Sequence, residues 1–232
     1  MLLAWWLKSR RIKGKVTVLD AGGGMPRFTR LFGERYPDHI DFQPHTVIRA
    51  VDPFARTVST DDGDVHFDHA MLLPPLRASA VVEQAGLLGQ DPQGKPTRWA
   101  GVDPLRLRAL EDERVFLAGD LLDAVSPLFG HYPKTAHMAT RLGVAAAQQI
   151  AARSRDGGAT STTEPLLALP HSVCHVWLDA DPVEQLRIET QYRLRGDGLI
   201  TQSVSQHDNP QPRGEDLQWG LGLYADALGV KQ

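Results

Sequence analysis

The amino-acid sequence predicts an α/β fold, and three observations lead to that prediction. An apolar run at residues 15–20 is followed by three glycines and then by apolar residues at helical spacing. A second apolar run at 114–120 ends in Gly119-Asp120, and a long helical pattern follows Pro133. The chain has 232 residues, 42% of them hydrophobic and 23% charged, which is typical of a globular protein with a buried core.

Composition excludes several classes of function. The formal net charge of -3 gives no broad basic field for nucleic acid or for an anionic membrane, whereas small acidic or neutral partners remain compatible with it. The only cysteine is Cys174, so no disulfide can close within the chain.

Residues 1–7 are apolar, and a basic cluster follows them rather than preceding them, which is the reverse of a signal peptide. The run is also far shorter than the roughly 20 apolar residues needed to cross a bilayer. We therefore predict no export signal, no membrane span and a buried helix. The alternative is a surface anchor with Trp5 and Trp6 in the membrane interface.

The first third of the chain is predicted to begin with a strand at 15–20, a glycine turn and a helix. The helix is indicated by periodic apolar residues, namely Phe28, Leu31, Phe32 and Tyr36. Short alternating stretches then predict a small antiparallel sheet that returns to a buried strand; they lie at residues 46–51, 57–60, 65–67 and 70–73. Pro74-Pro75 stops that last strand.

The middle of the chain is predicted to contain a short helix at 79–85, a turn-rich stretch at 86–104 and a strand at 114–120. Pro133 suits the first turn of a long helix that ends near residue 152, because a proline there loses no hydrogen bond. One face of this helix is expected to hold Thr135, Ala139, Leu142, Ala146 and Ile150.

Residues 153–165 have almost no apolar content and predict a linker. Beyond it, three strands and a terminal helix are expected, at 172–178, 185–194, 199–203 and 214–228. The turn Arg195-Gly196-Asp197-Gly198 is a strong hairpin signal between the last two strands.

Two glycine- or histidine-rich segments have competing interpretations. Gly22-Gly23-Gly24 suggests a phosphate cradle, but Arg27 stands where the dinucleotide fingerprint needs glycine, which favours a plain turn. Asp20 before it suits a ribose hydroxyl or a helix cap. In 171–175, strand alternation places His171 and His175 on one face and Cys174 on the other, which disfavours a metal site. His131 and His137 are expected to be surface or loop residues.

Gly119-Asp120 is the most informative pair. Glycine at a strand end lets a ligand approach the backbone, and the Asp120 carboxylate can accept hydrogen bonds from polyol hydroxyls. The helix after Pro133 would direct its positive end to the same crevice. This arrangement suits a flavin, with the acid on the ribitol and the helix dipole on the ring; the alternative is an ordinary strand end.

Three segments resemble the carboxyl-terminal part of the flavoprotein subunit of flavocytochrome c sulfide dehydrogenase, in the FAD-dependent pyridine nucleotide-disulfide oxidoreductase superfamily. Residues 72–78, Leu-Leu-Pro-Pro-Leu-Arg-Ala, resemble the family's Leu-Ile-Pro-Pro-Gln-Arg-Ala stretch. Residues 115–120 followed by 132–136 resemble the flavin-contacting Gly-Asp and the helix start after it. Cys174 lies where the family keeps the second cysteine of its redox disulfide.

The resemblance implies a partial two-dinucleotide-binding-domain flavoprotein with a carboxyl-terminal α+β interface domain. Its parts would be residues 1–78 as the second half of the NAD-like domain, 79–152 as the last part of the FAD-binding domain, 153–165 as the linker and 166–232 as the interface domain. It further implies that FAD is bound by Gly119, Asp120, Tyr132, Pro133, Lys134, Thr135, Ala136, Leu73, Pro74 and Pro75.

The implied activity is sulfide oxidation in the periplasm. Sulfide would attack a disulfide containing Cys174, the thiolate would pass two electrons to the flavin, and a c-type cytochrome subunit would remove them singly. The family's adenosine-diphosphate glycine fingerprint and partner cysteine have no counterpart in the sequence, so we expect an incomplete enzyme with weak FAD retention. The alternatives are a non-catalytic interaction module and a sulfide:quinone oxidoreductase-like protein.

Overall fold

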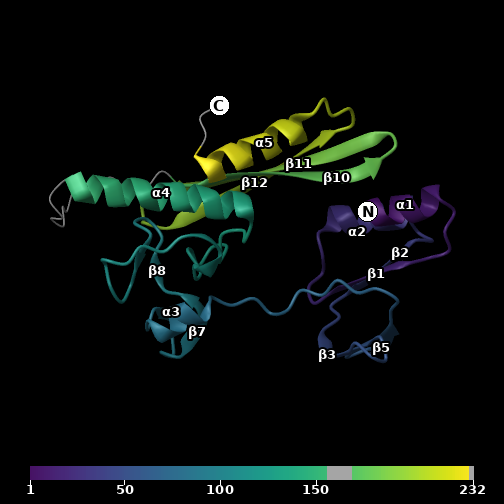
Figure 1. Cartoon of the computed structure of the whole chain (residues 1–232), viewed down its shortest axis with the longest axis horizontal. Helices are drawn as coiled ribbons and strands as arrows, with labels where there is room; N and C mark the ends of the chain where they lie inside the picture. Colours follow the sequence, from purple (N-terminus) through teal and green to yellow (C-terminus); the bar gives the residue numbers. More distant parts are fainter. Residues whose placement is uncertain (156–168, 230–232) are drawn as a thin grey trace. The chain divides into compact units, whose positions relative to one another are not determined.

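The structure, a computed structural model, describes residues 1–155 and 169–229 (Figure 1). These residues form two compact units. Unit 1 comprises Met1–Pro74 and Trp177–Gln185, and unit 2 comprises Pro75–Val176 and Leu186–Gln232. Helices and strands are mixed along the chain, so the predicted α/β class is confirmed. In the part of the chain that the structure describes, no helix is both long and apolar enough to cross a membrane.

Unit 1 contains the predicted strand, turn and helix. Strand β1 (Val16–Asp20) pairs in parallel with β2 (Ile40–Pro44), and helix α2 (Pro26–Arg35) makes the crossover that parallel strands require. Gly24 has a φ of +67°, and a Cβ there would lie 2.7 Å from the Phe42 ring. Only glycine fits at this position, so backbone geometry explains Gly24.

Helix α1 (Leu2–Ser9) forms as predicted, but it is not a buried helix. Only Ala4 is fully buried, against Tyr36 and Ile40, whereas Leu2, Leu3 and Trp6 are exposed. Apolar residues lie all around this helix, but only the face that carries Ala4 packs against other residues of unit 1. The remaining apolar side chains are therefore exposed.

The antiparallel sheet of unit 1 has the order β3-β4-β5, with β3 at Ile48–Asp52, β4 at Thr57–Thr60 and β5 at Gly63–His66. The strand predicted at 70–73 is wrong. These residues have no regular structure, and Met71 and Leu73 are 94% and 88% exposed. Their backbone has no neighbouring strand to pair with among the described residues, so apolar character alone produces no strand.

The tip of a hairpin completes unit 1. Strands β10 (His171–Ala180) and β11 (Val183–Leu194) are joined at this tip, and Arg35 at the end of α2 binds carboxylates on both sides of it. Its guanidinium lies 2.6 Å from Glu184 and 3.5 Å from Asp179. The bidentate shape of arginine suits such a double contact.

The first half of unit 2 is more regular than the sequence indicated. After helix α3 (Ala80–Gln84), the stretch predicted to be rich in turns contains a hairpin of β6 (Leu88–Gln90) and β7 (Pro96–Ala100). A smaller pair follows, formed by β8 (Val102–Asp103) and β9 (Arg108–Ala109).

The strand predicted at 114–120 is reduced to a single bridge between Phe116 and Arg108, followed by a 3-10 helix, η1 (Gly119–Leu121). The turn at Gly119 explains why extended structure ends before Asp120. A φ of +81° at this residue rotates the backbone away from an extended path, so no ladder continues to Asp120.

The second half of unit 2 has two helices and a three-stranded sheet ordered β10-β11-β12, with β12 at Ile200–Asn209. Helix α4 (Ala136–Arg155) begins three residues after Pro133, so the prediction that Pro133 lies in its first turn is wrong. The helix extends into the predicted linker, most of which lies outside the described residues. Helix α5 (Glu215–Leu228) and the hairpin turn at 195–198 confirm the predictions.

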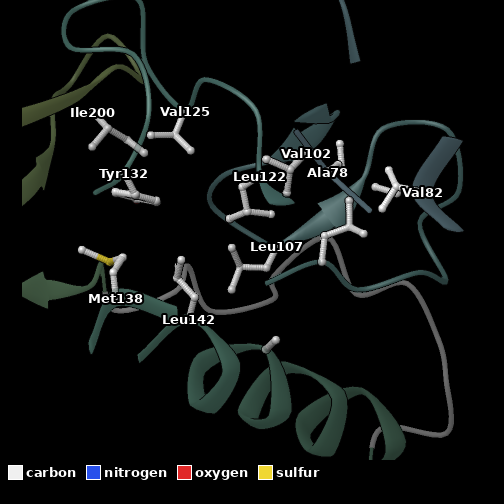
Figure 2. Close-up of a cluster of buried hydrophobic side chains, with 14 of the residues drawn as sticks. Ala78, Val82, Val102, Leu107, Leu122, Val125, Tyr132, Met138, Leu142 and Ile200 are labelled. Carbon is white, nitrogen blue, oxygen red and sulfur yellow. The ribbon is translucent and has the colours of Figure 1, made fainter. Parts of the chain in front are cut away.

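The main core lies in unit 2 and joins α4 to the strands and loops before it (Figure 2). Met138 and Leu142 point from α4 toward Tyr132, Leu107 and Leu122. Of the residues predicted to share one face, Leu142 and Ala146 are buried, but Ile150 is 48% exposed because the buried face is rotated toward His137 and Gln149.

Candidate functional site

Gly119 and Asp120 lie where the chain turns from the bridge at Phe116 toward α4. The positive φ of Gly119 places its backbone beside the first turn of that helix, where a Cβ would meet the Ala139 Cβ at 3.4 Å. The Asp120 side chain is exposed, and no hydrogen bond to its carboxylate is found among the described residues. The carboxylate is therefore available to a ligand.

Lys134 ties this turn to the start of α4. Its Nζ donates hydrogen bonds to the backbone oxygens of Asp120, at 2.7 Å, and Leu122, at 3.0 Å, and it lies 3.7 Å from the centre of the Trp99 ring. Burial lowers the pKa of Lys134, while the nearby carboxylates of Asp120 and Asp123 oppose that shift. These contacts lie within the protein, so Lys134 acts as a clamp that holds the Asp120 turn against the start of α4.

The first turn of α4 is accessible beside this clamp. Thr135 caps the helix, because its hydroxyl accepts a hydrogen bond from the Met138 N–H at 3.3 Å. Thr135 and Ala136 are exposed, and Pro133 is partly exposed. The helix has 20 residues, so its amino end carries a partial positive charge next to Asp120.

Tyr132 lies in the core. It is 5% exposed, and its ring contacts Tyr192 edge-on with 4.8 Å between ring centres. Burial raises the pKa of Tyr132, with a smaller contribution from Tyr192. Tyr132 thus supports the loop before Lys134 from below, rather than presenting its hydroxyl at the surface.

Cys174 lies on β10 with its side chain exposed. Partial burial raises the pKa of the thiol, and no cation lowers it in the part of the chain that the structure describes. A thiolate is the reactive form of cysteine, so this environment does not activate Cys174.

The opposite face of β10 lines a cavity of about 310 Å³. His171 and His175 both border it and Cys174 does not, which agrees with the alternation predicted for this strand. His137 of α4 borders it too, and the prediction that His137 is a surface or loop residue is wrong: it is buried, with Nδ1 3.1 Å from the Val173 carbonyl. The sequence did contain a signal for a helical position of His137, because Arg141 follows it one helical turn later and so lies on the same face of a helix.

Comparison with known proteins gives the fold. No protein-family model and no curated protein matches the chain. A pyridine nucleotide-disulfide family oxidoreductase from Enterococcus faecalis V583 is similar in structure, with a TM-score of 0.57 and 12% identity over 98% of this chain and 58% of that one. The chain has the fold of the carboxyl-terminal part of such an oxidoreductase.

Two further solved structures have weaker similarity. Reduced CoADR-RHD from Bacillus anthracis has a TM-score of 0.48 and 14% identity, over 97% of this chain and 44% of that one. The water-forming NADH oxidase from Lactobacillus brevis, bound to NADH, has a TM-score of 0.44 and 16% identity, over 81% and 48%. The chain therefore spans less than two thirds of the length of each of these three proteins.

The residues around Lys134 fit the flavin that the sequence led us to expect. An exposed carboxylate at Asp120 and an accessible helix end at Thr135 and Ala136 offer an acceptor for hydroxyls and a partial positive charge for an electron-rich ring edge. Lys134 holds these two features together through the backbone of Asp120.

The remaining predicted flavin contacts lie on the connection between the units. Leu73 and Pro74 belong to unit 1 and Pro75 to unit 2, and all three are exposed. The assignment of these three residues to a flavin site stays a prediction. Among the described residues, no group of three or more metal-binding side chains of His, Cys, Asp or Glu is present.

Proposed function

We propose that the chain is the carboxyl-terminal part of a flavin-dependent oxidoreductase of sulfide dehydrogenase type. The single observation that carries this proposal is the Lys134 clamp, which brings the Asp120 turn and the amino end of α4 together. The oxidoreductase fold supports it. FAD would be held by the Asp120 carboxylate and by the exposed first turn of α4.

Each residue has a defined part in this proposal. Asp120 accepts hydrogen bonds from ribitol hydroxyls, and the dipole of α4 stabilises negative charge on the ring. Bound flavin supplies the chemistry of accepting two electrons together and releasing them one at a time. Lys134 is a positioning residue, because its amine holds backbone oxygens rather than the cofactor.

Sulfide and a c-type cytochrome complete the proposed reaction. Sulfide attacks a disulfide between Cys174 and a second cysteine outside this chain; the S–S bond breaks, one sulfur becomes a persulfide and the other leaves as a thiolate. When a new sulfur–sulfur bond closes between this thiolate and the persulfide, two electrons are released, which bound flavin would accept and pass to the cytochrome. The cytochrome takes these electrons in two single steps. Cys174 is exposed on β10, so its sulfur is accessible to a second cysteine and to sulfide.

Titration with FAD tests the site. We expect the purified 232-residue chain to release flavin on dialysis, because its sequence contains no adenosine-diphosphate glycine fingerprint, and to quench FAD fluorescence when titrated. Asp120→Ala should weaken FAD binding about tenfold, since a hydrogen-bonded carboxylate is worth about 1.4 kcal/mol here. Asp62→Ala, at an exposed carboxylate of unit 1, is the matched control.

Two results would contradict the proposal. Equal FAD affinity for Asp120→Ala and the unmodified chain would remove Asp120 from the site. Tight, stoichiometric flavin in the purified chain would show that the remaining part of the oxidoreductase fold is not needed for binding.

One observation favours a second function, that of an interaction module without redox activity. Cys174 is the only cysteine in the sequence, so the chain by itself cannot form the disulfide that the reaction needs. Recovery of a c-type cytochrome on the immobilised chain, with no flavin absorption in the complex at saturating FAD, would establish this function instead.

A further inference from the structure

Helix α1 has an exposed apolar face. Leu2, Leu3 and Trp6 are 46%, 56% and 44% exposed. Trp6 follows the two leucines by about one helical turn, so the three side chains share a face, and Ala4, which packs against the rest of unit 1, lies on the opposite face. Large apolar side chains gathered on a surface usually mark an interaction site.

Positive charge continues this face beyond the end of the helix. Arg10 lies one helical turn after Trp6, and its backbone N–H donates a hydrogen bond to the Trp6 carbonyl at 3.0 Å. Arg11, Lys13 and Lys15 follow in the loop to β1 and are exposed. None of these four cationic side chains forms an ion pair with another described residue. They are therefore available to an anionic partner.

An open groove of about 600 Å³ contains three of these cations. Arg11, Lys13 and Lys15 line it together with Ile12, which is 39% exposed, so the basic loop also presents an apolar side chain. The groove lies at the amino ends of β1 and β2. Dinucleotides bind at the opposite, carboxyl ends of strands in sheets of this kind, so the groove is not a dinucleotide site.

The carboxylates near this surface do not cancel its positive charge. Asp38 is the only carboxylate that lines the groove. Asp179 and Glu184, at the hairpin tip beside the end of α2, share the guanidinium group of Arg35, and Glu34 pairs with an arginine of its own helix. The four cations thus form a local excess of positive charge, which the net charge of -3 for the whole chain conceals.

Apolar side chains beside unpaired cations match the surface of an anionic lipid bilayer. Leucine and tryptophan enter the interfacial region, while lysine and arginine contact the head groups. Free phosphate or a nucleic acid would engage the cations but would leave Leu2, Leu3 and Trp6 in water. The apolar face is the outside of a helix rather than a pocket, so it is suited to insertion between head groups.

The surface anchor considered from the sequence placed both Trp5 and Trp6 in the membrane interface. In the structure Trp5 packs against the small core of unit 1, and Trp6 alone of the two lies on the exposed face. The two leucines take the place that Trp5 was expected to fill.

We propose that unit 1 binds the surface of anionic membranes through α1 and the basic loop at residues 10–15. The apolar face of α1 lies among the lipid head groups, and the four cations contact lipid phosphates. Binding is peripheral, because α1 has eight residues and is far too short to cross a bilayer. This surface shares no residue with the proposed flavin site, and its function does not depend on flavin.

Sedimentation of the full 232-residue chain with lipid vesicles tests this proposal. Vesicles of equal parts phosphatidylglycerol and phosphatidylcholine should bind the chain at least about tenfold more strongly than pure phosphatidylcholine vesicles. Raising the ionic strength from about 0.1 M to about 0.5 M should weaken binding about tenfold, because salt screens the head-group charge. Glycerol 3-phosphate in millimolar amounts should not displace the chain, because it offers the phosphate without the bilayer.

A charge variant locates the basic part of the surface. Replacing both Lys13→Gln and Lys15→Gln should weaken binding to the mixed vesicles about tenfold or more. Replacing both Lys95→Gln and Arg98→Gln removes the same charge from exposed positions of unit 2, so this control should bind within about twofold of the unmodified chain.

An apolar variant locates the helix face. Trp6→Gln should weaken binding about threefold to tenfold, because it removes the ring that enters the interface. Val81→Gln, at a side chain that is 65% exposed on α3, is its control and should bind as the unmodified chain does. Circular dichroism melting of each variant shows that it is folded.

The proposal is overturned if the chain binds neither kind of vesicle or binds both equally, if glycerol 3-phosphate displaces it, or if the folded lysine and Trp6 variants bind as well as their controls. Retention on immobilised polyglutamate without binding to vesicles would assign the surface to an acidic protein instead. Should one variant fail to fold, the other variant and its control decide.

Discussion

Tyr36 is the largest fully buried side chain of unit 1, and its titration should be visible in the stability of the protein. It is 1% exposed, and its pKa is raised to about 12, first by burial and then by the neighbouring charge of Asp179. In the unfolded chain the phenol titrates near its ordinary value of 10.0. The folded state therefore holds the phenolic proton more tightly than the unfolded state.

The free energy of unfolding should therefore fall at alkaline pH. The stabilisation is complete below about pH 10 and is lost as the pH rises toward 12, at up to about 1.4 kcal/mol per pH unit. Tyr36→Phe cannot ionise, so its free energy of unfolding should fall less between about pH 9 and pH 11, by roughly 1 kcal/mol. Urea unfolding at both pH values measures the difference.

Tyr224 provides the control, because it is 71% exposed and its replacement by phenylalanine should leave the alkaline loss of stability unchanged. Tyr132 and Tyr192, whose pKa values burial also raises, are present in every variant and cancel in the comparison. A Tyr36→Phe protein that loses as much stability as the unmodified chain would show that the phenol is not held protonated.

The contacts of Lys134 were only partly predictable from the sequence. Its position after a proline and before a helix indicated a place beside Asp120, and its amine does lie on the Asp120 backbone. The Trp99 ring under the amine was not foreseen, because the chain between the two residues forms hairpins whose path no local pattern specifies. Contacts of this kind depend on tertiary packing rather than on spacing along the sequence.

At the scale of elements, the hairpin of β6 and β7 is packed tightly against the turn after η1. Gly89 has no room for a side chain: a Cβ there would meet the Asp123 carboxylate, the Thr97 hydroxyl and the backbone of Gly101. The Thr97 hydroxyl donates a hydrogen bond to Asp123, so any displacement of the carboxylate also breaks this bond.

We therefore expect Gly89→Ala to lower the free energy of unfolding by about 1–3 kcal/mol, as overpacking in a core does. Thermal or urea unfolding measures the change. Gly94→Ala is a poor control because its φ of +76° makes any side chain strained, whereas Gly143→Ala on α4 meets nothing and should be neutral or slightly stabilising. Equal stability of Gly89→Ala and the unmodified chain would contradict the packing described for this hairpin.

Elements with strong local signals were predictable, and those that depend on a distant partner were not. The parallel pair β1 and β2 and helix α5 follow from periodicity and turn residues. The stretch at 70–73 has the same apolar character as β1, yet it lacks a neighbouring strand and is exposed. The hairpin at 88–100 was hidden because glycines and prolines, which usually interrupt strands, lie inside it.

At the scale of the whole molecule, the two units differ greatly in the size of their cores. Unit 2 buries a continuous cluster that joins α4 to β11, β12 and the loops before them (Figure 2). Unit 1 has a small buried cluster of Ala4, Tyr36 and Ile40 with a few partly buried neighbours, and Leu31, Val58 and Leu178 are buried outside this cluster. Since buried apolar area is the main source of stability, unit 1 should be the less stable part of the chain.

Hydrogen exchange followed by mass spectrometry tests this order. Peptides from β1 and β2 should exchange at lower denaturant concentration than peptides from α4 and β11, because opening unit 1 exposes less apolar surface. Tyr36→Ala should accelerate exchange in β1 and β2 and leave α4 unchanged, whereas Gly89→Ala should have the opposite pattern. One transition shared by all four elements, with both variants shifting it equally, would show instead that the described chain unfolds as a single cooperative body.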